Sequence, residues 1–418
     1  MDHHRDNPEA RQDEPPEDGP GVYETLVSAG YRVSLRGFSA IDQYLGLAPL
    51  PFTWVETDAD LTVLARFFDR LRFPGVDLAD GALEAGGRSW YFRCLDLEEA
   101  LPGSAESWSP AFTLLSLNQD WSTRHFRDPC GVYPIIRLLR EGPAKRVSPG
   151  EKLRWMTPRP GTDRYRAAME GALILARYGM EEGRGLAEII RVIQDLPWGL
   201  APGTESQRVL LTGLLLSPRP DLGMELLKGC GFIGEFWPEF SILDDVDHSK
   251  EFHPEGNVWK HTMETFRYRK PSARGGRAYD LRLSLGLLFH DTGKPLSESS
   301  GSRRFDGHAE LGAGVARRFL ERLEFDPALI GDTVYLVKNH MLPAALPRLP
   351  LTRTEKIMAS PLFPTLMELY RCDESSSFKG LDAYYESSAA YQAYLRYRRN
   401  PYRSADGKKL ALRSGPGH

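Results

Sequence analysis

Histidines and aspartates in the C-terminal half of the chain carry its clearest chemical signal. Four of the ten histidines lie between positions 261 and 340, each on or at the end of a predicted helix, and one is followed directly by an aspartate. Neutral imidazole and carboxylate are suitable ligands for divalent ions such as Mn, Fe, Ni, Co and Zn. The pattern predicts a metal site whose candidate ligands are His261, His290, Asp291, His308, His340 and Asp373.

The pair His290-Asp291 follows the apolar stretch 281–289, which has helical periodicity. Adjacent side chains at a helix end diverge by about 100° and can still reach one centre. The Asp291 carboxylate can also bridge two ions. Two metals about 3.5–4 Å apart can activate water and neutralise charge on a phosphoryl oxygen. The pair therefore predicts phosphate-ester hydrolysis, with Asp291 as the bridging ligand.

The residues after this pair predict how the helix ends. Gly293 can take the left-handed cap conformation, and Pro295 can block continuation of the helix. Between them, Lys294 can reach a phosphate as a point charge, so we assign Asp291 and Lys294 as the candidate catalytic residues. The alternative for Lys294 is a solvated lysine in a turn.

Hydrophobic periodicity predicts an α+β fold that is mostly helical. Residues 31–35, 52–55 and 89–93 have the pattern of short strands, and residues 60–72 have that of a helix. From residue 162 onward helical patterns dominate, at 165–178, 186–194, 221–229, 281–289, 309–323 and 365–372. We expect an α/β head, a helical neck and an all-α metal-binding domain.

A chain of 418 residues exceeds what one hydrophobic core usually supports. Shifts in composition mark a disordered leader and a linker rich in proline and charge between an α/β part, the head, and a helical part. The family resemblance described below implies that the helical part divides into a neck, a metal-binding domain and a basic and aromatic tail. The predicted bounds of the leader, head, linker, neck, metal-binding domain and tail are 1–20, 21–142, 143–160, 161–245, 246–395 and 396–418.

The bulk composition excludes several classes of protein. A formal net charge of −4 argues against a surface that is basic everywhere, although one local basic face remains compatible with it. No apolar run reaches the roughly 18 residues of a membrane span, and the N-terminus lacks a signal-peptide core, so a cytoplasmic protein is expected. The four cysteines form no CxxC pair, which argues against a disulfide framework or a closed structural zinc site.

The series of histidines and aspartates resembles the HD superfamily of metal-dependent phosphohydrolases, in the extended version that accommodates a second metal. The wording of residues 252–262 (FHPEGNVWKHT) resembles the HD domain fused to bacterial tRNA CCA-adding nucleotidyltransferases and poly(A) polymerases. The resemblance implies an all-helical domain that binds one or two divalent ions, with Mn, Ni, Co, Fe, Mg and Zn not distinguished. It implies cleavage of nucleotide monophosphates, cyclic phosphates or phosphodiesters. His253 is as consistent with a structural loop residue as with this site.

Three N-terminal segments and one further segment resemble the same nucleotidyltransferase family. Residues 37–46 are similar to its glycine-rich turn, 55–59 to the end of its catalytic strand, 112–118 to a later Phe-Thr motif, and 222–240 to its helical neck. The resemblance further implies that the tRNA-contacting body and tail of longer members are missing or nearly so.

The residues that would carry nucleotidyl transfer are replaced in this register. Phe52 and Trp54 stand where the family places its two metal-binding aspartates, and an aromatic ring cannot replace a carboxylate on a hard cation. Phe38 replaces the second glycine of the turn. The degenerate motif therefore comprises Gly37, Phe38, Asp42, Phe52 and Trp54. An alternative register that recruits Glu56 and Asp58 as the metal pair remains open.

The segment 394–403 interleaves aromatic and basic residues, a pattern that can neutralise phosphates while stacking on bases. Its candidate RNA contacts are Arg396, Arg398, Arg399 and Arg403. The favoured alternative is a solvated helix end whose tyrosines pack on the body.

Three functions remain as hypotheses. The first is a phosphohydrolase acting on nucleotides or on RNA or tRNA 3′ ends, in which a metal-bound hydroxide attacks phosphorus and the N-terminal domain is a scaffold or RNA-docking module. The second is a surviving CCA-adding or poly(A) nucleotidyltransferase. The third is a non-catalytic RNA- or nucleotide-binding protein.

Overall fold

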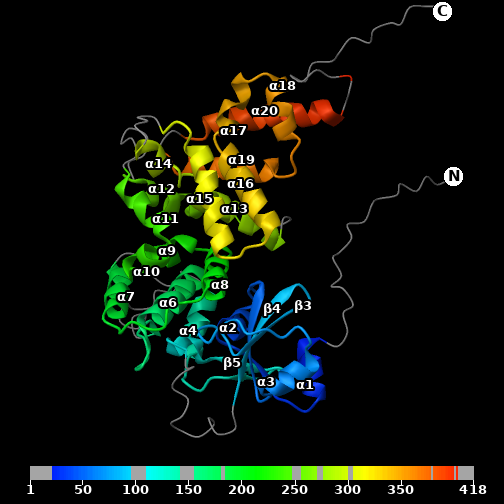
Figure 1. The fold of residues 1–418 in the computed structure, drawn as a ribbon, viewed down its shortest axis with the longest axis vertical. Helices are drawn as coiled ribbons and strands as arrows, with labels where there is room; N and C mark the ends of the chain where they lie inside the picture. The colour runs from blue at the N-terminus through cyan, green and yellow to red at the C-terminus, as the bar shows by residue number, and fades with distance from the viewer. Residues whose placement is uncertain are drawn as a thin grey trace, which may run out of the picture. The chain divides into compact units, whose positions relative to one another are not determined.

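The computed structural model describes residues 21–95, 110–141, 155–179, 184–246, 256–270, 276–299, 305–377, 380–399 and 402 (Figure 1). The chain forms two compact units, Met1–Arg146 and Val147–His418. The division between them falls inside the segment 143–160 that composition marks as a linker. The predicted leader, residues 1–20, lies outside the described residues.

The first unit is built on a mixed sheet of six strands in the order β3-β4-β2-β1-β5-β6. The strands are β1 Val33–Arg36, β2 Phe52–Thr57, β3 Gly81–Ala85, β4 Arg88–Cys94, β5 Asn118–Asp120 and β6 Phe126–Arg127. Only β2 and β4 pair in parallel; the other neighbours are antiparallel. The three strands predicted from the sequence are thereby confirmed.

The β3–β4 hairpin turns through Gly86 and Gly87, which both have positive φ (57° and 65°). Two-residue hairpin loops favour such conformations because their twist matches that of the strands. The register places Ala85 opposite Arg88, which sets both strands of the hairpin.

In the described part of the first unit, five helical segments accompany the sheet: α1 Val22–Ser28, α2 Gly37–Leu45, α3 Leu61–Phe67, the 3₁₀ turn η2 Thr113–Ser116 and α4 Tyr133–Glu141. Helix α3 begins where expected, because the Asp60 side chain accepts a hydrogen bond from the Val63 N–H at 2.7 Å. The prediction of a helix as far as residue 72 is wrong. Phe68 is already extended, and the Arg72 N–H donates to the Ala82 carbonyl in β3, so sheet pairing overrides the helical pattern.

The described part of the second unit consists of helices and turns. Its first helices are α6 Arg164–Tyr178, α7 Arg184–Gln194, α8 Thr204–Leu215, α9 Pro220–Gly229, α10 Phe232–Phe236, α11 Pro238–Ser241 and η3 Ile242–Asp245. They are followed by α12 Val258–Arg267, α13 Gly276–Phe289, α14 Lys294–Ser299, α15 His308–Arg322, α16 Pro327–Asn339, α17 Leu342–Ala345, η4 Leu346–Arg348, α18 Leu351–Met358, α19 Phe363–Ser375 and α20 Asp382–Arg399. An α+β fold that is mostly helical is confirmed.

An aromatic cluster joins the predicted neck to the predicted metal-binding domain. The ring of Phe240 lies 5.2 Å from that of Phe289 and 5.0 Å from that of Phe319, and the ring of Trp237 lies 6.0 Å from that of Phe319. Trp237 is fully buried, and its indole N–H donates to Gln207 at 3.0 Å. The predicted neck and the predicted metal-binding domain therefore share a core. The aromatic cluster within this core includes Phe289, the residue immediately before His290.

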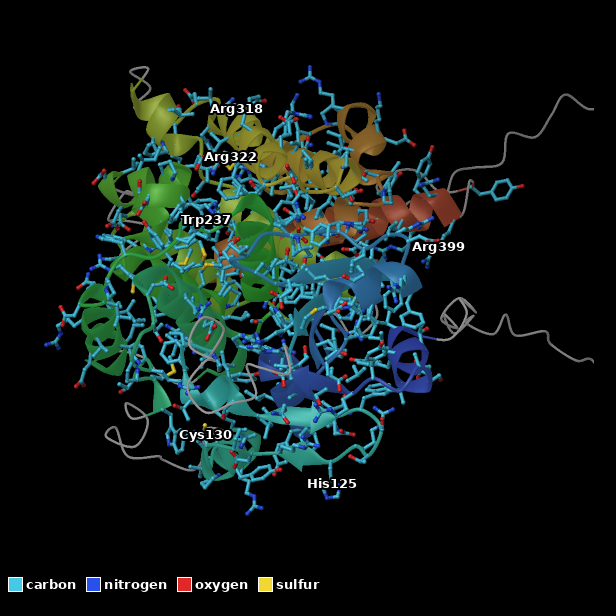
Figure 2. All side chains as sticks on the ribbon, turned by 60° about the horizontal axis from the view of Figure 1, so that its bottom comes forward. His125, Cys130, Trp237, Arg318, Arg322 and Arg399 are labelled. Atoms are coloured by element: carbon cyan, nitrogen blue, oxygen red, sulfur yellow. The ribbon has the colours of Figure 1, made fainter. Side chains whose placement is uncertain are left out.

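An ion pair supports the same junction at the surface. Arg322 on α15 donates to both carboxylate oxygens of Glu239 at 2.9 Å and to the Phe236 carbonyl at 2.9 Å (Figure 2).

Within the residues that the structure describes, no helix is long and apolar enough to cross a membrane.

Candidate metal centre

Five helices of the second unit present the predicted metal ligands, mostly from helix ends. His261 lies one turn into α12, whose start is fixed by Asn257, because that side chain accepts a hydrogen bond from the Lys260 N–H at 2.9 Å. His308 is the first residue of α15, and His340 is the C-cap of α16. Asp373 was expected to follow a helix that ends at residue 372. That expectation is wrong, because α19 continues to Ser375 and carries Asp373 within its last turn.

The pair His290-Asp291 continues directly from α13. The His290 N–H still donates to the Gly286 carbonyl at 2.9 Å, so its side chain keeps a helical direction. Gly286 itself faces α19, where an added Cβ would lie 2.7 Å from a methyl carbon of Leu369. The absence of a side chain at Gly286 thus lets α13 pack closely on the helix that carries Asp373.

The structure brings the six predicted ligands into two adjacent groups. The first ligand group is His261, His290 and Asp373, and the second is Asp291, His308 and His340. Within each group the potential ligand atoms lie within 4.8 Å of one another. The Nε2 atoms of His261 and His290 are 3.4 Å apart, and those of His308 and His340 are 3.1 Å apart.

Asp291 lies between the two histidine pairs. Its Oδ2 is 3.3 Å from Nε2 of His290 and 3.8 Å from Nε2 of His261. Its Oδ1 is 3.6 Å from Nε2 of His308 and 4.0 Å from Nε2 of His340. One carboxylate oxygen therefore faces each pair, which is the arrangement that a carboxylate shared by two ions requires.

The Nδ1 atom of each of these histidines has a hydrogen-bond partner, which determines which ring nitrogen carries the hydrogen. In His290, His308 and His340 the Nδ1 atom lies 2.8, 2.7 and 2.7 Å from the carbonyl oxygen three residues earlier. A carbonyl can only accept, so Nδ1 carries the hydrogen and Nε2 keeps its lone pair. In His261 the Nδ1 atom lies 3.3 Å from Oγ of Ser376. The Nε2 lone pairs of His290, His308 and His340 are thus available to an ion. Nε2 of His261 lies 3.0 Å from Oδ1 of Asp373, an oxygen that can only accept, so an ion bound there would replace a hydrogen bond between the two.

Burial and charge favour the ligand forms of these side chains. Burial lowers the pKa of His340 to about 4 and also lowers the pKa of His308, so both imidazoles are neutral near pH 7. Burial by itself would raise the pKa of Asp291. The charges of His290 and Lys294 outweigh that effect and hold the pKa of Asp291 well below its ordinary value.

Lys294 lies inside the centre rather than in a solvated turn. Its Nζ is 2.6 Å from Oδ2 of Asp291, the oxygen that faces the first ligand group, and its side chain is only 13% exposed. An ammonium group has three donors, so this ion pair does not exhaust the hydrogen-bonding capacity of Lys294.

The left-handed conformation expected at Gly293 is not found, because Gly293 is not among the residues with positive φ. Its role is close packing: an added Cβ would lie 2.0 Å from the carbonyl oxygen of His308 and 2.5 Å from the backbone nitrogen of Gly312. Nor does Pro295 only stop a helix, since it is the second residue of α14, where proline is tolerated.

In the first unit, the degenerate motif is an aromatic cluster. The ring of Trp54 on β2 lies 4.9 Å from that of Phe52 and 5.5 Å from that of Phe38 on α2. Gly37 begins α2 with φ +53°, and Asp42 is buried in the same helix.

The alternative carboxylate pair lies farther along β2. Both oxygens of Asp58 are held by Arg32, through its backbone N–H at 2.7 Å and its Nε at 2.9 Å. Glu56 is partly exposed on β2. Asp58 is therefore already engaged in an ion pair.

The basic C-terminal segment is the end of α20. Arg396, Arg398 and Arg399 are exposed there, and Figure 2 labels Arg399 at the end of the helix. Tyr394, by contrast, is 1% exposed and packs against the rest of the unit. This is the arrangement of the favoured alternative, a helix end with tyrosine packed inward. Arg403 and His253 lie outside the described residues.

Comparisons with known proteins agree with the predicted resemblance. Residues 258–360 match the HD domain family. A CC-adding tRNA nucleotidyltransferase of Thermus thermophilus is 32% identical over 185 residues, which make up 42% of this chain and 41% of that protein. An A-adding tRNA nucleotidyltransferase of Deinococcus radiodurans is 32% identical over 165 residues, 37% of this chain and 36% of that protein. The chain thus spans about two fifths of the length of these curated relatives.

Among solved structures, a tRNA-processing enzyme in an apo form aligns with 90% of this chain and 95% of its own, at 14% identity and a TM-score of 0.44. That likeness is too distant to bear on function. The family match and the relatives confirm that the chain combines an HD domain with similarity to tRNA nucleotidyltransferases. Together with the two ligand groups, they indicate dependence on a divalent metal, whose identity they do not distinguish.

Proposed function

We propose that this HD-domain protein, a relative of tRNA nucleotidyltransferases, is a metal-dependent phosphohydrolase that acts on nucleotides or on RNA ends. The observation that carries the proposal is the position of Asp291, whose two oxygens face two different pairs of imidazole Nε2 atoms. No structural zinc site or disulfide chemistry explains such a buried set of nitrogen and oxygen donors.

The donor set fits one or two divalent ions. His261, His290 and Asp373 would hold one ion, His308 and His340 the other, and Asp291 would contribute one oxygen to each. A bound pair of ions supplies Lewis acidity, which activates water and neutralises charge on a phosphoryl oxygen. The absence of cysteine from both ligand groups favours an open catalytic site over a closed structural one.

The protein's own residues orient this chemistry. The carbonyl acceptors on Nδ1 fix three imidazole rings before any ligand binds, so little reorganisation is needed. Lys294 balances the charge of Asp291 and would attract a substrate phosphate as a point charge. Burial of His290 and Asp291 excludes bulk water from the centre, which strengthens these electrostatic interactions.

The names of the relatives specify tRNA, which supports an RNA or nucleotide phosphate as the substrate. We assign activity on phosphodiesters, 2′,3′-cyclic phosphates or nucleotide monophosphates. The first unit would serve as a scaffold or RNA-docking module, because Phe52 and Trp54 would stand where the resembled family has a metal-binding carboxylate pair. The cytoplasmic location expected from the sequence stays a prediction.

The direct test is hydrolysis of bis-p-nitrophenyl phosphate and 2′,3′-cyclic AMP by the full chain with Mn, Ni, Co or Mg. Activity that requires metal and disappears in Asp291→Ala supports the proposal. The proposal fails if no metal supports turnover, or if Asp291→Ala retains it.

Nucleotidyl transfer is the second candidate, and the names of the relatives favour it. Labelled ATP or CTP would then be incorporated into tRNA, and Glu56→Ala or Asp58→Ala would abolish the incorporation. The ion pair of Asp58 with Arg32 speaks against this role. A non-catalytic RNA- or nucleotide-binding protein would instead bind metal and RNA, with steep salt dependence and no turnover.

A further inference from the structure

Ser376 lies directly behind the first ligand group. It is the C-cap residue of α19, it is buried, and it follows Asp373 by three positions. Its hydroxyl contacts two of the candidate ligand residues at once. The Oγ atom lies 2.6 Å from the backbone carbonyl oxygen of Asp373 and 3.3 Å from Nδ1 of His261.

The chemistry of these two partners sets the direction of both hydrogen bonds. The carbonyl of Asp373 can only accept, so the Ser376 hydroxyl donates its single hydrogen there. An oxygen lone pair of Ser376 is then left for His261, whose Nδ1–H must be the donor. When the first ligand group holds an ion, His261 would thereby be kept as the tautomer whose Nε2 lone pair faces that ion, in place of the contact that Nε2 makes with Oδ1 of Asp373 at 3.0 Å.

His261 differs in this respect from the other three histidines. Their Nδ1 atoms face backbone carbonyl oxygens at 2.7–2.8 Å, which no substitution of a side chain removes. The acceptor for His261 is a side-chain hydroxyl at a longer distance, 3.3 Å. On its Nδ1 side, the ring of His261 therefore depends on a side-chain group that a substitution can remove.

The same contact couples two helices. His261 on α12 meets α19 on both sides of its ring, through Oδ1 of Asp373 at 3.0 Å from Nε2 and through Ser376 at Nδ1. Nearby, Arg371 of α19 donates to the carbonyl of Tyr268, the C-cap of α12, at 2.6 Å. The first ligand group is complete only while these two helices keep this register.

We propose that Ser376 is a positioning residue for the first ligand group: by accepting the Nδ1–H of His261, it fixes the tautomer and ring orientation that the first ion needs. The inference rests on the proposed metal-dependent function. It predicts an asymmetric centre. Loss of the Ser376 hydroxyl should lower the affinity for an ion at His261, His290 and Asp373, while the affinity at His308 and His340 is retained.

The experiment is a titration of the metal-free full chain with Co²⁺, in which binding is measured by calorimetry and by the absorption of bound Co²⁺. Replacement of an outer partner of a metal-ligating histidine typically weakens metal binding about 10- to 100-fold. We expect a loss of this size at one of two sites in Ser376→Ala, and recovery in Ser376→Thr, which restores a hydroxyl. Ser375→Ala is the matched control, because that neighbouring hydroxyl donates to the Arg371 carbonyl and does not touch His261.

A second readout reports the tautomer directly. In long-range ¹H–¹⁵N spectra of the imidazoles, Ser376→Ala should alter the nitrogen signals of His261 and leave those of His308 and His340 unchanged. Wild-type affinity at both sites in Ser376→Ala overturns the inference. So does equal weakening of both sites, or an equal effect of Ser375→Ala.

These outcomes are separable from those of the proposed function. Two bound ions without hydrolysis of any phosphoester would refute the phosphohydrolase and leave the role of Ser376 standing. Hydrolysis by the wild type with unchanged metal binding in Ser376→Ala would refute only the role of Ser376. A wild-type chain that binds no Co²⁺ would refute both.

Discussion

The ammonium of Lys294 lies 2.6 Å from Oδ2 of Asp291, on the side of that carboxylate that faces His261 and His290. The same oxygen is the one that would serve the first ion. Lys294 therefore balances the charge of the bridging aspartate and, at the same time, competes with a cation for one of its oxygens.

Lys294→Met should separate metal binding from turnover. Metal affinity should be unchanged or tighter, because the competing ammonium is gone. Hydrolysis should fall roughly 100-fold, the usual cost of one preorganised donor to a phosphoryl oxygen. Calorimetric titration and steady-state kinetics check both quantities. A parallel loss of metal affinity and activity would contradict this role for Lys294.

Asp291→Asn should destabilise the protein as well as abolish hydrolysis. The substitution leaves the largely buried Lys294 ammonium without its carboxylate, which costs about 3–5 kcal/mol. The double variant Asp291→Asn with Lys294→Met should regain much of that stability and no activity. Urea unfolding of the metal-free proteins measures the difference, and a double variant no more stable than Asp291→Asn would argue against the ion pair.

Gly293→Ala should destabilise the protein by disrupting the close packing of Gly293 against the first turns of α15. Its Cβ would meet the backbone of His308 and Gly312, and such overpacking costs about 1–3 kcal/mol or more, because neither backbone atom can move independently. Gly331→Ala, within α16, is the control, since nothing lies within 4 Å of its added Cβ. Thermal unfolding should show a lowered Tm for Gly293→Ala only.

Phe52→Ala should destabilise the first unit without affecting hydrolysis. Phe52 is buried in the central strand of the sheet, so loss of its ring costs about 3–5 kcal/mol. Phe73→Ala, at a position 71% exposed, should change stability by less than about 0.5 kcal/mol. Calorimetry and the phosphodiester assay test this together. A loss of metal-dependent turnover in Phe52→Ala would show that the first unit takes part in the reaction.

The stability of the metal-free protein should fall as the pH is lowered from about 6.5 toward 4. Burial lowers the pKa of His340 to about 4, whereas the unfolded chain takes up this proton near 6.5. Between these values the unfolded state binds more protons, so acid favours unfolding, by on the order of 3 kcal/mol for this residue.

His340→Gln removes that proton-binding site and is the comparison for the pH effect. The difference in unfolding free energy between wild type and His340→Gln should narrow by about 2–3 kcal/mol between pH 7 and pH 4.5. A difference that stays constant over this range would show that His340 is not held neutral by burial.

Most of the candidate centre could be predicted from local sequence. The ligand types, the His290-Asp291 pair and the position of each histidine near a helix end depend on periodicity and on capping residues such as Asn257, which act within one or two turns. The residues at which helices end were less predictable. The helix expected over 60–72 ends at Phe67 because Arg72 pairs with Ala82 across the sheet, and a local pattern carries no information about that partner.

The sequence by itself determined the chemistry available to this protein: which imidazoles and carboxylates it has, that they recur at helix ends, and that Phe52 and Trp54 on β2 are aromatic. Only the tertiary structure decided how they act together. That each oxygen of Asp291 faces a different histidine pair, that Lys294 binds Asp291, that Gly293 packs on α15 and that Ser376 holds His261 all depend on contacts between helices far apart in the chain. Such contacts follow from the packing of whole helices around a shared core, and no pattern within one helix specifies them.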